Sequence, residues 1–237
     1  MRALLLAAGM GTRLRPITDT IPKCLVPIHG KPLLDYWLES LFSGNAIERA
    51  VINTHYLASV VEDHVALSPW RSRIDLVFEP ELLGTGGTLV ANRERLGEGP
   101  VLVAHADNLT DFDVAGFAAF HAARPATAAM SMLAFRTDAP RTCGILELDG
   151  QGLVQAFHEK VENPPGNLAN AAVYIVEPEM IDFAAKLGKP FVDLSTEVIP
   201  HFIGRIAVME TPGYHRDIGN PESLARAHAE FRPGEGA

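Results

Sequence analysis

The stretch ALLLAAGMGTRL, residues 3–14, joins an apolar run to two glycines and an arginine. The run from Leu4 to Ala8 is short and carries no polar side chain, which is typical of a strand buried on both faces of a sheet. Gly9 and Gly11 follow it at once, and glycines let the backbone come close to an anion and point its N–H groups at it. The stretch therefore predicts a buried strand that leads into an anion-binding turn.

Strand-like and helix-like segments alternate through the first half of the chain. Pro32 to Phe42 places its apolar residues on one helical face, with the acids Asp35 and Glu39 opposite. Further strands are expected at 50–53, 74–78 and 101–104, and further helices at 60–67, 88–96 and 114–123. Because such alternation is typical of a parallel sheet with helices on both faces, we expect an α/β fold with a mostly parallel central sheet flanked by helices.

The second half of the chain is a mixture of strands, turns and helices. Strands are expected at 129–135, 144–148, 154–158 and 171–176, and helices at 178–187, 195–202 and 221–231. Asn220 is the expected N-cap of the last helix and Pro221 its first residue. No linker or repeat interrupts the chain, so we expect one domain, residues 1–237, with a parallel half (1–125) and a mixed half (126–237).

The composition excludes several classes of protein. Of 237 residues, 47% are hydrophobic and 21% are charged, which is enough apolar material for a core. A net charge of −9 argues against general binding to nucleic acid or to an anionic membrane, and no stretch approaches the roughly 20 apolar residues of a membrane span. Cys24 and Cys143 have no metal-binding spacing, and unpaired thiols fit a reducing compartment. We expect a cytoplasmic protein that binds neither nucleic acid nor membranes.

Positive charge is concentrated at the start of this acidic chain. The first 31 residues hold five basic side chains and a single acid. Thr12 offers a hydroxyl donor, Arg13 a planar fork that matches phosphate geometry and Lys23 a second charge, so the turn suits a triphosphate. It is neither a dinucleotide fingerprint, because Leu14 stands where a third glycine is needed, nor a Walker P-loop, which needs Gly-Lys-Ser/Thr. Chance clustering is the alternative that charge alone leaves open.

Ordered motifs extend over the whole chain. Residues 6–18 and Pro22-Lys23 match the pattern L-A-G-G-x-G-T-R-L-x-P-x-T followed by P-K. The other motifs are ELLGTGG at 81–87, Ala106-Asp107, Glu159-Lys160 and DIGNP at 217–221. Together they resemble the signature of the sugar-1-phosphate nucleotidyltransferases, the NDP-sugar pyrophosphorylases. Within that family, the resemblance is greatest to short mannose- and manno-heptose-1-phosphate guanylyltransferases.

The resemblance implies a Rossmann-like nucleotidyltransferase fold and an enzyme of the EC 2.7.7 type. Such an enzyme joins a sugar 1-phosphate to a nucleoside triphosphate and releases pyrophosphate. The attacking phosphate, with a second pKa of roughly 6, is mostly dianionic at pH 7, so no general base is required. Catalysis then consists of holding two anions in line and neutralising their repulsion. Arg13 and Lys23 are the expected catalytic residues.

The expected cofactor is Mg²⁺, with Asp107 and Asp217 as its ligands. Mg²⁺ prefers one or two carboxylates together with phosphate oxygens and waters. Asp107 follows an expected strand of the parallel sheet, and ligands bind at the carboxyl ends of such strands. An ordinary turn role is the alternative for each aspartate, and Asp111 and Asp113 are rival ligands.

The nucleotide subsite is expected at the glycine turn and at a second glycine-rich segment. Its predicted residues are Ala8, Gly9, Gly11, Thr12, Arg13, Glu81 and Gly86. A carboxylate at Glu81 only accepts hydrogen bonds, so it suits the N–H and NH₂ donors of guanine and opposes the oxygens of uracil or thymine. The expected nucleotide is therefore GTP. The alternatives are a solvated surface glutamate at Glu81 and a plain helix-entry loop around Gly86.

The resemblance implies a sugar-phosphate subsite in the mixed half. Its predicted residues are Gly144, Glu159, Lys160 and Asn170, and a surface ion pair is the alternative for Glu159 and Lys160. The expected acceptor is mannose 1-phosphate or manno-heptose 1-phosphate, and the activated sugar would feed cell-surface glycan synthesis. The chain departs from the family where Ala106 replaces a glycine and where Ala171-Ala172 follow Asn170, so the usual position of the sugar is in doubt.

Two other functions stay open at this point. The same fold could transfer a cytidylyl or uridylyl group to another phosphorylated acceptor, or the chain could be a nucleotide-binding regulatory subunit without catalysis. The histidines at 55, 105, 158 and 215 have no metal-binding spacing and are expected to be structural or peripheral. Because the sequence ends soon after Asp217, no C-terminal β-helix and no acetyltransferase activity are expected.

Overall fold

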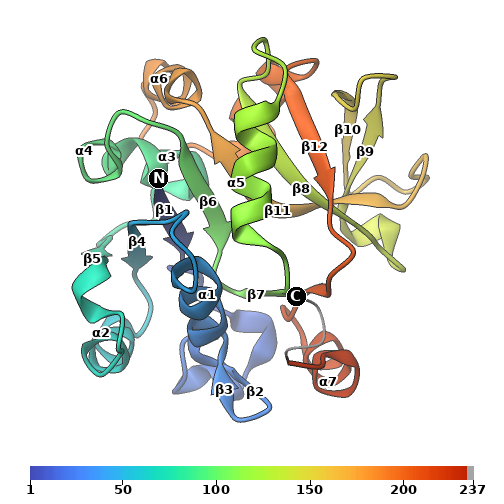
Figure 1. The fold of residues 1–237 in the computed structure, drawn as a ribbon. Coiled ribbons are helices and arrows are strands. Elements are labelled where there is room, and N and C mark those ends of the chain that lie inside the picture. Colours follow the sequence, from blue (N-terminus) through green and yellow to red (C-terminus); the bar gives the residue numbers. More distant parts are fainter. Residues whose placement is uncertain (234–237) are drawn as a thin grey trace. The chain divides into compact units, whose positions relative to one another are not determined.

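A computed structural model describes residues 1–233 (Figure 1). The chain divides into two compact units, each assembled from separate segments. Unit 1 comprises Met1–Leu82, Ala104–Ala115 and Gly213–Ala237, and unit 2 comprises Leu83–Val103 and Gly116–Pro212. The single domain with halves meeting near residue 125 stays a prediction. Among the described residues, no helix is both long enough and apolar enough to span a membrane.

Three parallel strands and two helices form the framework of unit 1. The strands β1 (Arg2–Leu6), β4 (Arg49–Thr54) and β5 (Ile74–Phe78) pair in that order, side by side in Figure 1. Helices α1 (Leu33–Phe42) and α2 (Ala58–Ala66) connect them. All five elements lie within two residues of where the sequence predicts them, because strands with few or no polar side chains and an amphipathic helix leave distinct patterns.

Helix α1 buries the face that its sequence pattern predicts. Its buried residues are Leu33, Leu34, Trp37, Leu38, Leu41 and Phe42. The helix begins at Leu33 and not at Pro32, because Pro32 has the extended ψ of 144° and pairs in a short ribbon, β2 (Pro27–Ile28) with β3 (Lys31–Pro32). The indole Nε1 of Trp37 donates a hydrogen bond to the carbonyl of Asn108 at 2.9 Å. This bond ties the helix to the segment that follows Asp107.

A short antiparallel ribbon joins distant parts of unit 1. Strand β7 (Asn108–Thr110) pairs with β13 (His215–Asp217), and Asp217 lies opposite Asn108. The helix α7 (Pro221–Glu230) follows, capped as predicted: the Asn220 side chain accepts a hydrogen bond from the backbone N–H of Ser223 at 2.8 Å. The ribbon therefore brings Asp217 beside the residue that follows Asp107.

Unit 2 contains a mixed sheet, as predicted. Its strands are β8 (Met130–Arg136), β9 (Gly144–Leu148), β10 (Val154–Glu159), β11 (Leu168–Val176) and β12 (Ile206–Glu210). The neighbours β10–β9, β9–β11 and β11–β8 are antiparallel, whereas β8–β12 is parallel. Strand β12 is not predicted from the sequence. The chain passes from one unit to the other within β6 (Val101–His105) and again within α5 (Val114–Ala123), between Ala115 and Gly116.

The remaining helices are short. The predicted helix 88–96 is two helices, α3 (Gly84–Ala91) and α4 (Arg93–Leu96). They separate at Asn92, whose side-chain Nδ2 donates to the carbonyl of Thr88 and competes with the helical ladder. The predicted helix 178–187 is α6 (Pro178–Lys186), and 195–202 is a π turn, Leu194–Val198, followed by a 3-10 turn, Ile199–Phe202. Other 3-10 turns are Thr12–Leu14, Ile17–Asp19, Lys23–Leu25, Arg71–Arg73 and Pro140–Thr142.

Candidate active site

The glycine turn follows β1, and a hydrogen bond from the buried Thr18 stabilises it. Gly11 has a φ of 61°, a left-handed conformation that favours glycine. A Cβ there would lie 2.9 Å from Cγ2 of Thr18. The Thr18 hydroxyl donates a hydrogen bond to the Gly11 carbonyl at 2.7 Å. Thr18 is the last residue of the N-terminal motif, and its supporting role is one that the sequence analysis missed.

Arg13 lies on the exposed side of this turn and reaches Asp217. Its Nη2 is 3.8 Å from Oδ2 of Asp217, and 69% of the arginine side chain is exposed. Gly219 makes this approach possible, because a Cβ there would lie 2.6 Å from Nη2 of Arg13 and 2.8 Å from Oδ2 of Asp217. The guanidinium is thus close to a carboxylate and still accessible to an incoming anion.

Lys23 joins the two aspartates that the sequence predicts as metal ligands. Its Nζ donates to Oδ2 of Asp107 at 2.7 Å and to Oδ1 of Asp217 at 2.8 Å. The lysine side chain is only 7% exposed. Since both carboxylates bind one ammonium, the two acceptor oxygens are no further apart than the sum of those distances. The structure therefore brings together the two predicted catalytic residues, Arg13 and Lys23, and the two predicted metal ligands, Asp107 and Asp217.

Mutual attraction keeps Lys23 and Asp107 ionised. Burial alone would lower the pKa of Lys23, but the adjacent carboxylates of Asp107 and Asp217 outweigh burial and raise it. Burial alone would raise the pKa of Asp107, and here the Lys23 ammonium, with His105 as a smaller contribution, lowers it. At neutral pH the lysine is therefore charged and Asp107 is a carboxylate, the form that binds a cation.

The two carboxylates fit a magnesium ion that also binds phosphate. Within residues 1–233, no group of three or more His, Cys, Asp or Glu side chains is arranged to hold a metal. Mg²⁺ needs only one or two carboxylates when phosphates and waters supply its other ligands. Asp107 and Asp217 meet that requirement next to the turn, where a Cβ built on Gly9 would lie 4.0 Å from Oδ2 of Asp107. A cation bound here would be adjacent to the expected triphosphate.

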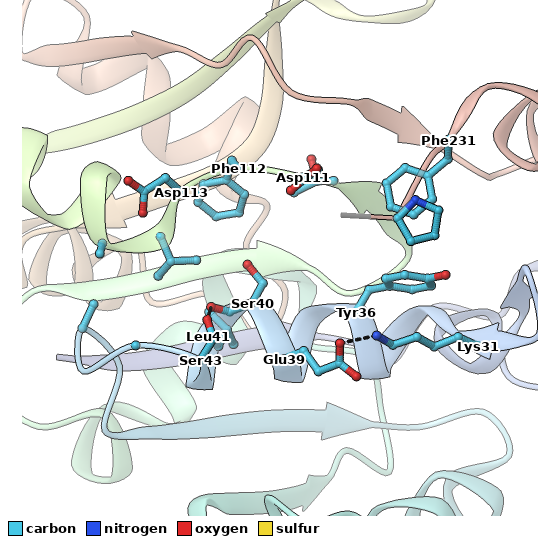
Figure 2. Close-up of a pocket in the computed structure, with 16 residues that line it drawn as sticks. Lys31, Tyr36, Glu39, Ser40, Leu41, Ser43, Asp111, Phe112, Asp113 and Phe231 are labelled. Atoms are coloured by element: carbon cyan, nitrogen blue, oxygen red, sulfur yellow. Dashed lines mark hydrogen bonds and ion pairs between the residues drawn. The ribbon is translucent and has the colours of Figure 1, made fainter. Parts of the chain in front are cut away.

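The rival aspartates line a separate cavity of unit 1. A cavity of about 480 Å³ lies beside α1, and Figure 2 shows Asp111 and Asp113 at its wall with Phe112 between them. Lys31, which pairs with Glu39, lines the same cavity. Lys23, Arg13 and the two metal-ligand candidates are not among its lining residues. Asp111 and Asp113 thus line a cavity whose lining does not include the lysine-centred cluster, and their role as rival ligands stays a prediction.

Glu81 and Gly86, the other two predicted nucleotide-binding residues, lie outside the glycine turn. Glu81 is exposed, whereas its neighbour Glu79 is 3% exposed. The backbone N–H of Gly86 donates to the carbonyl of Val192 at 2.9 Å, and a Cβ on Gly86 would lie 2.8 Å from Cγ1 of Val192. Packing against Val192 is therefore one requirement for glycine at position 86, and its N–H is already bonded. The nucleotide-binding roles of both residues stay predictions.

Unit 2 gathers three of the four predicted sugar-phosphate residues around β9 and β10. Gly144 lies opposite Glu159, and a Cβ on Gly144 would lie 2.6 Å from Oε2 of Glu159. Nζ of Lys160 is 3.1 Å from Oε1 of Glu159. A Cβ on Gly144 would also lie 2.6 Å from two ring atoms of Phe157. The missing side chain at position 144 thus leaves the space that the Glu159 carboxylate and the Phe157 ring fill.

Asn170, the fourth of these residues, is held by a tyrosine that the sequence analysis missed. Its Nδ2 donates to the hydroxyl of Tyr174 at 2.7 Å, and its Oδ1 accepts from the N–H of Ala172 at 2.8 Å. Burial raises the pKa of Tyr174 to about 12, with Glu159 contributing in the same direction. Ala172 has a φ of 53°, so the position where the related family often has glycine does adopt a conformation that favours glycine.

Two curated relatives are similar to this chain over at least 94% of its length. A mannose-1-phosphate guanylyltransferase of Mycobacterium tuberculosis is 32% identical over 237 residues, covering 97% of this chain and 64% of that protein. The mannose-1-phosphate guanylyltransferase catalytic subunit beta of Danio rerio is 30% identical over 231 residues, 94% of this chain and 62% of that protein. The chain thus spans less than two thirds of the length of these curated relatives.

The solved structure of HddC from Yersinia pseudotuberculosis, complexed with GMP-PN, is similar over its whole length. It has a TM-score of 0.81 and 26% identity, and it covers 98% of this chain and 99% of that chain. The likeness confirms the predicted fold class, α/β with a mostly parallel central sheet and flanking helices. A family model described as nucleotidyl transferase matches residues 2–233. Because this match runs from the first strand through the last helix, the described chain as a whole belongs to the nucleotidyl transferase family.

Proposed function

We propose that the protein transfers a nucleotidyl group from a nucleoside triphosphate to a sugar 1-phosphate and releases pyrophosphate. The observation that carries the proposal is the Lys23 ammonium held between Asp107 and Asp217 next to a glycine turn. If Asp107 and Asp217 bind a divalent cation, the Lys23 ammonium and the nearby Arg13 guanidinium would be free to pair with the charge of the two reacting phosphates. The names of the relatives, mannose-1-phosphate guanylyltransferases among them, support this reaction class.

The reaction needs positioning and charge more than acid–base chemistry. An oxygen of the sugar phosphate attacks the α-phosphorus, the bond from that phosphorus to the bridging oxygen breaks, and pyrophosphate leaves with that bond's electrons. Arg13 and Lys23 neutralise the triphosphate, and the N–H groups of the turn fix its position. A bound Mg²⁺, held by Asp107 and Asp217, would supply Lewis acidity toward the phosphate oxygens.

GTP and a mannose-like sugar 1-phosphate are the proposed substrates. Glu81 is exposed and therefore accessible to a base, and a carboxylate suits the donors of guanine. The relatives named above are mannose-1-phosphate guanylyltransferases, and the HddC structure is a complex with GMP-PN. In unit 2, the carboxylate of Glu159 and the amide of Asn170 can hydrogen-bond sugar hydroxyls, while Lys160 supplies a charge for phosphate.

A substrate panel tests the proposal. Four nucleoside triphosphates are crossed with mannose 1-phosphate, manno-heptose 1-phosphate and other phosphorylated acceptors in the presence of Mg²⁺, and pyrophosphate release is measured. We expect release with GTP and a mannose-like acceptor. Release confined to CTP or UTP would replace the substrate assignment. Tight nucleotide binding without release on any acceptor would contradict the activity and indicate a regulatory protein.

The substitution Glu81→Gln tests base recognition. Replacing one oxygen by an NH₂ group leaves a donor where guanine also presents donors, so we expect the ratio of kcat/KM for GTP to that for UTP to fall about tenfold. Glu62→Gln, a matched change at an exposed glutamate of α2, should leave the ratio unchanged. An unchanged ratio in Glu81→Gln as well would exclude Glu81 from base recognition.

The substitution Gly144→Ala tests the sugar subsite. The added methyl group would overlap Oε2 of Glu159 and the ring of Phe157. Because both must shift and the carboxylate is the proposed sugar contact, we expect KM for the sugar 1-phosphate to rise about tenfold while KM for GTP stays the same. Gly150→Ala is the matched control, because a Cβ at that turn glycine meets nothing within 4 Å. Equal effects on both substrates would indicate general destabilisation and contradict the assignment.

A further inference from the structure

A buried polar pair lies next to the first residues of the glycine turn in unit 1. Asn53, at the carboxyl end of β4, and Glu79, directly after β5, are each 3% exposed. Oδ1 of Asn53 accepts a hydrogen bond from the backbone N–H of Ala7 at 2.8 Å. Nδ2 of Asn53 donates to Oε1 of Glu79 at 3.1 Å. Hydrogen bonds therefore connect the buried Glu79 carboxylate, through the Asn53 side-chain amide, to the backbone N–H of Ala7, just before the turn.

The direction of these bonds determines the orientation of the asparagine amide. The Ala7 N–H can only donate, so it requires the oxygen of Asn53 on its side. The NH₂ group must then face Glu79, whose carboxylate can only accept. The carbonyl of Leu6, directly before Ala7, accepts from the N–H of Ala106 at 3.0 Å. The backbone between β1 and the turn is thus held on both sides of one peptide bond.

Packing of the hydrophobic core does not explain why the Glu79 side chain is buried. A carboxylate excluded from water costs free energy unless hydrogen bonds compensate for the lost hydration, and apolar side chains would fill the same space at no such cost. The carboxylate does provide a strict acceptor that keeps Asn53 in one orientation. Glu81, two residues on, is exposed, so burial is particular to Glu79.

We propose that Asn53 and Glu79 are positioning residues that hold the start of the glycine turn in the conformation that binds the nucleotide. This inference rests on the proposed function, because it assigns the turn to a nucleoside triphosphate. Neither side chain needs to touch the substrate. Glu79 orients Asn53, Asn53 fixes the Ala7 N–H, and the turn from Ala8 to Gly11 presents its N–H groups from that fixed point.

Exchange of the two functional groups tests the proposal. In Asn53→Asp, the new carboxylate faces that of Glu79, and the pair can keep a hydrogen bond only by taking up a proton. We therefore expect the affinity for Mg·GTP, measured by calorimetry at pH 8.5, to fall about tenfold or more. In the double variant Asn53→Asp with Glu79→Gln, the carboxylate introduced at position 53 still accepts from the Ala7 N–H, and the amide introduced at position 79 donates to that carboxylate. We expect affinity within about threefold of wild type there. Glu79→Gln alone should be mild, since its amide oxygen can accept from Asn53.

A second readout separates this inference from the proposed function. Hydrogen exchange of the Ala7 amide, followed by NMR without nucleotide, should speed up at least tenfold in Asn53→Asp and return toward the wild-type rate in the double variant. If wild type binds no triphosphate in the panel, the proposed function fails while the exchange result still stands on its own. A weakened double variant, or one that does not fold, would overturn the positioning role, because it retains both hydrogen bonds.

Discussion

Replacing Lys23 by methionine is expected to lower kcat for nucleotidyl transfer by about 10³-fold, equivalent to about 4 kcal/mol of transition-state stabilisation. Methionine preserves most of the length and apolar volume of the side chain but removes the ammonium that joins Asp107 and Asp217. The carboxylates then repel each other and the triphosphate loses a buried positive charge. Steady-state pyrophosphate release at saturating substrates measures the effect.

The control for this substitution is Lys31→Met. Lys31 is also a paired lysine of unit 1, but its partner is Glu39 and it lies beside the separate cavity. We expect that variant to keep wild-type turnover within about threefold, since surface ion pairs contribute little. Circular dichroism shows whether Lys23→Met still folds. A folded Lys23→Met enzyme with near wild-type kcat would remove Lys23 from the mechanism.

Replacing Asp107 by asparagine is expected to reduce kcat/KM by about 10²-fold or more, and to weaken the affinity for Mn²⁺ in the presence of nucleotide. Asparagine keeps the shape and one oxygen but loses the negative charge that a divalent cation needs. It also removes one of the two carboxylates that pair with Lys23 and leaves that of Asp217. Turnover and Mn²⁺ binding by electron paramagnetic resonance are the two measurements.

Asp111→Asn provides the matched comparison for Asp107. Asp111 lies four residues further on and lines the separate cavity (Figure 2). Its substitution should leave both turnover and Mn²⁺ affinity within about threefold of wild type. The opposite pattern, with loss in Asp111→Asn and none in Asp107→Asn, would transfer the metal site to the rival aspartates.

Elements of the fold can be predicted where apolar runs and turn residues mark them within a short stretch of sequence. Strands β5 and β9 begin and end at the residues that the sequence predicts, because burial and turn residues mark their limits. Strand β12 (IAVME) is not predicted, because its partner β8 is remote in sequence. The ribbon of β7 with β13 was missed for the same reason, since three residues carry no periodic signal.

Residues of the site that are distant in sequence can be predicted to lie together only from their resemblance to a family motif. Lys23 and Asp217 are 194 positions apart, and no spacing in the sequence predicts that they hydrogen-bond; resemblance to a family does. Glu79 and Glu81 look alike in sequence, and only the structure shows that one is buried and the other exposed. The chain leaves its strand at Phe78, so the regular alternation of sides no longer applies there.

A crystal structure with GTP and Mg²⁺ tests the central claim most directly. The account predicts a triphosphate bound by the N–H groups of residues 9–12 and by Arg13, with one cation that touches carboxylate oxygens of both Asp107 and Asp217. A triphosphate bound away from the turn, or a cation that contacts neither aspartate, would contradict it.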